Sequence, residues 1–154
     1  MYEWALFLHL AGAILFFAGI AVAAVAEISA RGPKRPSEVA AVLGTARWGV
    51  LLVASGLLLA VGAGFWLLEE TAYGLDGWVQ AALALVVVSF VAGGIGGQGP
   101  KRARRLAQQL AADGDERSPE LDAALRAPLA AVFNAIATVA AIAILVLMVW
   151  KPGA

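Results

Sequence analysis

The stretch that decides the fold is WALFLHLAGAILFFAGIAVAAVA, residues 4–26, an uncharged run that contains the single histidine of the chain, His9. At about 1.5 Å per residue, a helix of these residues is about 34 Å long, enough to cross a hydrocarbon core of about 30 Å. On a helical wheel, His9, Gly12, Gly19 and Glu27 fall within one stripe. Small residues between two polar groups predict a face on which a membrane helix packs against its neighbours.

The composition places the whole chain in the membrane class. Of its 154 residues, 62% are hydrophobic and 14% are charged, against about 25% charged in soluble domains. Three more long apolar runs follow the first, and a soluble fold of this length could not bury four of them. The residues before the first run include an acid and no Lys or Arg, so we expect a retained helix rather than a signal peptide. The absence of cysteine excludes disulfides and thiolate sites.

These patterns predict an all-α integral membrane bundle, a single domain over residues 1–154. Its four transmembrane helices are expected at about 4–26, 48–68, 78–97 and 128–150, with connections at 27–47 and 98–127. Ser37 is a predicted N-cap, and a helix from there to Leu68 would be about 48 Å long. Such a helix either projects from the membrane or breaks near Gly44.

The connection 98–127 is expected to hold two short helices. KRARRLAQQLAADG, residues 101–114, predicts a basic amphipathic helix that can continue the third membrane helix beyond Pro100. A second helix is predicted to follow, with Ser118 as its N-cap and Pro119 at its first position.

Charge predicts the orientation. Of eleven Lys and Arg residues, four lie in or beside the connection 27–47, six lie in 98–127, and Lys151 alone lies on the opposite side. Six of the seven Tyr and Trp residues also fall on that opposite side. The positive-inside rule and the aromatic belt then place both termini and the 69–77 loop outside, and both long connections in the cytoplasm.

Small and polar residues predict contacts between the helices. Gly49, Gly56, Ala60 and Ala63 lie on one side of the second helix, a face suited to close packing. Among the polar residues, an ion pair is expected between Glu27 and Arg47 at the inner interface, and interhelical hydrogen bonds are expected from Asn134 and Thr138. No polar line runs the full depth of the bundle, as a pore would need.

A glycine motif, GIGGQG at residues 94–99, literally matches GxGxxG. The dinucleotide fingerprint needs a preceding strand and a helix N-terminus directed at the pyrophosphate. Because this motif ends a membrane helix, we interpret it as close helix packing and an exit from the bilayer.

His9 is the principal candidate for chemistry, as a metal or cofactor ligand. A neutral imidazole at this depth can ligate haem iron or copper, relay a proton, or hydrogen-bond a neighbouring helix. Met148 is predicted within about 5 Å of the same membrane level, and a histidine with a methionine is an acceptable haem axial pair. Since no second histidine is present, the structural hydrogen bond is favoured over haem or copper.

A basic cluster follows the third helix. It comprises Lys101, Arg102, Arg104 and Arg105. Each basic residue near an anionic leaflet is attracted to it by about 1 kcal/mol. Binding to acidic lipid headgroups therefore explains this cluster without a nucleic-acid partner.

Five stretches together resemble a known family. They are the opening MYEWALFLHLAGAILFFAGI, the pair Arg47-Trp48, GFWL at 64–67, RARRL at 102–106 and the closing LMVWKP at 147–152. They resemble the bacterial predicted integral membrane proteins called domain of unknown function 2269, over nearly the whole chain. That family is similar in its histidine-bearing first helix to copper-resistance protein D and, more remotely, to the four-helix haem-associated protoporphyrinogen oxidase of bacteria. The resemblance implies a membrane bundle in a bacterial cytoplasmic membrane and carries over only His9 as a candidate ligand.

Taken together, the sequence favours a non-enzymatic membrane scaffold or accessory subunit, with a second copy or another membrane protein as its partner. Two alternatives stay open. One is a haem- or copper-binding redox or carrier protein that uses His9, although the further histidines and methionine-rich loops expected for copper handling are missing. The other is a small transporter.

Overall fold

The computed structural model describes residues 1–32, 35–71 and 76–152. Its elements are α1 (Tyr2–Ala30), α2 (Pro36–Glu70), α3 (Gly77–Gly96), α4 (Gln98–Ala112), α5 (Pro119–Leu125) and α6 (Pro128–Trp150). The structure is 88% helical, and four of its helical segments are long and apolar enough to cross a membrane. The predicted all-α membrane bundle of four long helices is therefore confirmed.

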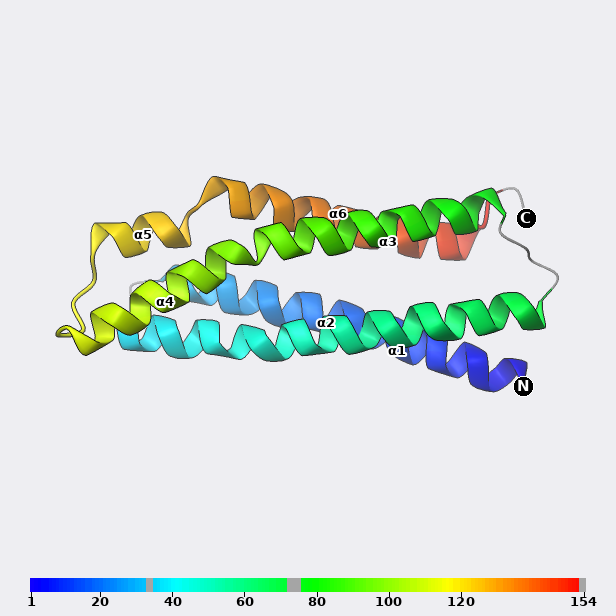
Figure 1. The fold of residues 1–154 in the computed structure, drawn as a ribbon, viewed down its shortest axis with the longest axis horizontal. Coiled ribbons are helices and arrows are strands. Elements are labelled where there is room, and N and C mark those ends of the chain that lie inside the picture. The colour runs from blue at the N-terminus through cyan, green and yellow to red at the C-terminus, as the bar shows by residue number, and fades with distance from the viewer. Residues whose placement is uncertain (33–34, 72–75, 153–154) are drawn as a thin grey trace.

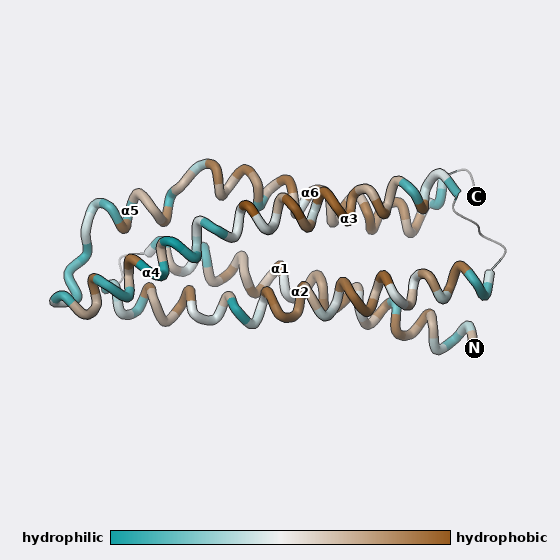
Figure 2. Tube along the Cα trace, in the orientation of Figure 1, coloured by the Kyte–Doolittle hydropathy of each residue, from teal (hydrophilic) through white to brown (hydrophobic). Residues whose placement is uncertain are grey.

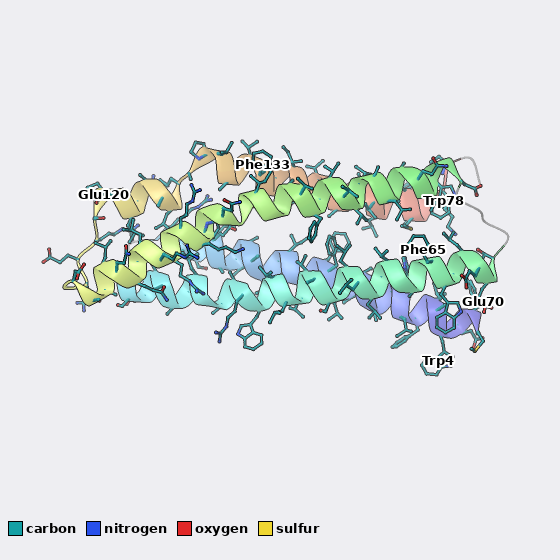
Figure 3. The ribbon with its side chains drawn as sticks, in the orientation of Figure 1. Trp4, Phe65, Glu70, Trp78, Glu120 and Phe133 are labelled. Atoms are coloured by element: carbon teal, nitrogen blue, oxygen red, sulfur yellow. The ribbon has the colours of Figure 1, made fainter. Side chains whose placement is uncertain are left out.

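The four long helices form two pairs. Helix α1 packs along α2, and α3 packs along α6; α4 then crosses from the end of α3 to contact α2 (Figure 1). The middle of each long helix is hydrophobic, whereas hydrophilic residues gather on α4 and α5 (Figure 2). Trp4 and Trp78 lie at the end of the molecule where α1 begins and α6 ends, and Glu120 lies at the opposite end (Figure 3).

Glycines bring the backbones of α1 and α2 into direct contact. A Cβ atom added to Gly12 would lie 2.8 Å from the carbonyl oxygen of Gly56, and one added to Gly56 would overlap the backbone nitrogen of Phe16. A second crossing is equally close, because a Cβ atom on Gly19 would lie 2.6 Å from the carbonyl oxygen of Gly49. The two small-residue faces predicted from the sequence thus pack on each other, as in other close membrane helix pairs.

Helix α2 runs unbroken over 35 residues, about 52 Å at the usual rise. It does not break at Gly44, so its first turns project beyond the apolar spans. Residues 36–47 of α2, together with α4 and α5, form a unit that we call the helical cap. The core of the cap is apolar and consists of Val39, Leu43, Ala103, Ala107 and Leu121, which pack with Ala30 at the end of α1.

The start of α2 is held by a residue that is distant in the sequence. The helix begins at Pro36 with Arg35 as its N-cap, so the prediction of Ser37 as N-cap was wrong. Ser37 instead donates its backbone N–H and its hydroxyl to the Asp115 carboxylate, at 2.7 Å each. Both bonds hold the pKa of Asp115 below its ordinary value, and the hydroxyl bond has the larger effect. A carboxylate is favourable at this position because a helix N-terminus carries partial positive charge.

A second contact ties the turn between α4 and α5 to the turn between α1 and α2. The Arg117 guanidinium donates to the Gly32 carbonyl oxygen and forms an ion pair with Asp122. From one short turn, Asp115 therefore binds the start of α2, and Arg117 binds the turn that follows α1.

The direction of α4 follows from its first turn. Pro100 has no N–H to donate to the carbonyl of Gly96, and its ring crowds that carbonyl, so the helix bends where α4 begins. The bend directs α4 towards α2 (Figure 1). Helix α5 begins as predicted, with the Ser118 side chain accepting the Leu121 N–H at 3.3 Å.

Candidate functional site

A polar contact joins the two helix pairs near the helical cap. The Asn134 side chain on α6 donates to both carboxylate oxygens of Glu27 on α1, at 3.1 Å each. Arg47, the predicted partner of Glu27, lies elsewhere, with its guanidinium carbon 5.1 Å from the centroid of the Trp48 ring. The predicted ion pair was therefore wrong. The Glu27 side chain faces α6, where Asn134 binds its carboxylate.

Asn134 also explains the glycine motif at the end of α3. A Cβ atom on Gly96 would overlap the Asn134 side chain, and one on Gly99 would lie 2.6 Å from the Cβ of Ala130. Both glycines therefore lie where α6 approaches most closely. The motif acts in helix packing, as the sequence interpretation expects.

A small cavity lies beside Glu27. It is lined by Glu27 and Arg31 on α1 and by residues of the helical cap and α6, and its volume is about 20 Å³. That volume holds about one water molecule. The contact between Glu27 and Asn134 is therefore suited to joining helices, with space beside it for about one water molecule.

Two further hydroxyl groups differ from the sequence predictions. Thr138 donates to the Asn134 carbonyl of its own helix at 2.9 Å and is exposed, so the predicted interhelical bond was wrong. Ser89 on α3 donates to the Ala137 carbonyl on α6 at 3.1 Å, and its side chain is buried. Sequence reasoning missed Ser89, although an isolated hydroxyl in the middle of an apolar membrane helix is a signal for such a bond.

His9 contacts α2. Its Nδ1 lies 2.8 Å from the carbonyl oxygen of Ala60. Because a carbonyl only accepts, Nδ1 carries a proton and donates this bond, and Nε2 takes no part in it. The ring also lies over Gly64, where an added Cβ would be 3.3 Å from Nδ1. This is the interhelical hydrogen bond that the structural interpretation of His9 predicts.

Met148, the proposed axial partner of His9, belongs to the other helix pair. Helix α6 packs on α3, whereas His9 bonds α2, so Met148 and His9 belong to different helix pairs. Within the described parts of the chain, no group of three or more His, Cys, Asp or Glu residues could hold a metal ion.

The basic cluster lies on α4. Three of its members are exposed and Arg104 is half-buried; the exposed ones are Lys101, Arg102 and Arg105. On the opposite side of the helix, Ala103 and Ala107 are fully buried in the helical cap. Burial of the alanines leaves the exposed charges directed away from the cap core.

The comparisons with known proteins point to one family. The family described as "Predicted integral membrane protein (DUF2269)" matches residues 4–152. No curated protein and no solved structure matches the chain.

Proposed function

The chain belongs to the DUF2269 family of predicted integral membrane proteins, and we propose that it is a non-enzymatic scaffold or accessory subunit of the membrane. The observation that supports this role is how the polar groups within the spans are used. His9, Ser89 and Asn134 each bond a neighbouring helix. The glycine faces of α1 and α2 are occupied by each other, so a second copy or a membrane partner would use other surfaces.

We infer that the helical cap lies in the cytoplasm and both termini outside, in a bacterial cytoplasmic membrane, with bilayer spans near 4–26, 48–68, 78–97 and 128–150. The basic residues concentrated on and beside the cap support this orientation. In this orientation the exposed side of α4 contacts the headgroups of the inner leaflet. Anionic lipids are then a partner of the cap, at about 1 kcal/mol for each basic residue near the surface.

The orientation has a direct test, because the chain contains no cysteine that would react in the background. Asp76→Cys, just before α3, is expected to react with a membrane-impermeant maleimide in intact cells. Asp113→Cys, at the end of α4, should react only after the membrane is permeabilised. The reverse labelling pattern would overturn the orientation.

A second candidate function, binding of haem or copper by His9, is supported by the imidazole geometry. A metal-binding histidine usually donates its other ring N–H to a backbone carbonyl or carboxylate, which fixes the tautomer. His9 donates Nδ1–H to the Ala60 carbonyl, so Nε2 is the atom that would bind a metal.

Thermal unfolding in detergent separates the two functions. For a scaffold, His9→Gln should change stability by less than about 0.5 kcal/mol, and His9→Leu by about 0.6 kcal/mol, because only one interhelical hydrogen bond is involved. Neither haem nor Cu(I) should then shift the unfolding temperature of the wild type. For a metal or haem protein, the added ligand should raise that temperature in the wild type and in neither variant.

An absorption spectrum provides the control. Protein purified after haem-replete expression should show no Soret band if His9 is structural. A Soret band that His9→Leu removes would contradict the scaffold function.

A further inference from the structure

A hollow between α2 and α4 brings together two arginines that are far apart in the sequence. Arg47 of α2 and Arg104 of α4 both line it, with Gln108 beside Arg104 and Gly44 on the side of α2. Its volume is about 360 Å³, and no acidic residue lines it. We propose that this hollow binds one anionic phospholipid through the phosphate of its headgroup, held between Arg47 and Arg104.

The side chains around the hollow suit a phosphate. Arginine presents planar N–H donors that match phosphate oxygens, and the Gln108 amide adds an uncharged donor. The Arg47 guanidinium packs against Trp48, which keeps the charge beside the hollow. Thr45 donates its hydroxyl to the Val42 carbonyl at 2.7 Å, so this hydroxyl is already used within α2.

The level of the hollow in the membrane indicates that the phosphate belongs to a lipid headgroup. Arg47 and Trp48 stand where α2 enters its long apolar run, at the level where a tryptophan and an arginine meet lipid headgroups. A basic pocket between helices at this level favours an anionic headgroup, whose acyl chains can extend along the apolar surface of the spans. This site rests on the proposed function, in which the helical cap contacts anionic lipids. It adds that one lipid binds at a defined position between α2 and α4.

Two double variants with equal loss of charge test the site. Arg47→Gln/Arg104→Gln removes both arginines that line the hollow. Arg102→Gln/Arg105→Gln removes two exposed arginines of the same basic cluster that do not line it. Binding of one phosphatidylglycerol, measured by native mass spectrometry in a zwitterionic detergent, should weaken about tenfold for each lining arginine and less than about threefold for the control pair.

A third variant keeps every charge and fills the space. A Cβ atom on Gly44 meets nothing within 4 Å and Gly44 lines the hollow, so we expect Gly44→Leu to fit the fold and to fill part of the hollow. Leucine is also the better helix former, so the thermal stability of the variant should be unchanged or higher. Loss of tight phosphatidylglycerol binding in this stable variant is the expected result. Wild-type binding in Gly44→Leu would overturn the site.

The remaining outcomes separate this proposal from the one on which it rests. If the wild type shows no preference for phosphatidylglycerol over phosphatidylcholine, both the lipid contact and the site fall. If the two double variants lose binding equally, the surface contact stands and the site is overturned. If inorganic phosphate binds as tightly as phosphatidylglycerol, the hollow is not a lipid site.

Discussion

Gly56→Ala is expected to destabilise the protein by about 3 kcal/mol, the upper part of the usual range for overpacking. The new methyl group would overlap the backbone nitrogen of Phe16 and lie 2.7 Å from the carbonyl oxygen of Gly12. Backbone atoms cannot rotate away as a side chain can, so α1 and α2 must move apart. Their separation would also weaken the second glycine crossing and the bond from His9.

Gly62→Ala is the matched control, since it makes the same change on the same helix. Nothing lies within 4 Å of a Cβ atom at Gly62, and the residue is exposed. Its stability should be unchanged or higher by up to about 1 kcal/mol, because alanine favours a helix over glycine. Titration with SDS, followed by circular dichroism, measures both variants. Equal loss in the two would contradict a backbone contact at Gly56.

Asn134→Leu is expected to cost about 1 kcal/mol, the lower end of the penalty for a polar group that loses its partner, because Glu27 and Asn134 are both half-buried. The Glu27 carboxylate accepts both of its described side-chain hydrogen bonds from Asn134. Thr138→Val, on the same helix, removes only an exposed hydroxyl that bonds its own helix, and should cost less than about 0.5 kcal/mol.

Glu27→Gln distinguishes the polar contact from packing around Asn134. Glutamine can accept the Asn134 N–H through its carbonyl oxygen, so Glu27→Gln alone should be nearly neutral. In the Glu27→Gln background, Asn134→Leu should cost less than in the wild type, because no carboxylate is left without its partner. A double-mutant cycle by SDS titration measures this coupling. Equal costs of Asn134→Leu in both backgrounds would show that packing against Gly96, rather than the bond to Glu27, is what Asn134 provides.

Local patterns in the sequence determined the four apolar helices, the close faces of α1 and α2, and the capped start of α5. A run of apolar residues has no stable alternative to a helix in lipid, because each backbone N–H and carbonyl needs a partner within the helix. Glycines at helical spacing likewise mark one face, whatever lies against it. These properties depend on neighbours within a few residues, so the sequence alone predicts them.

Only the tertiary structure decided which polar groups meet. A helical wheel gives the direction of Glu27 on α1, yet it cannot say whether Arg47 or Asn134, 107 residues away, lies there. The same holds for Asp115, which bonds the start of α2 from 78 residues away, and for the meeting of Arg47 with Arg104. Each depends on how the helix pairs rotate and on where the bend at Pro100 directs α4. Those angles are set by packing between distant segments, which no local pattern records.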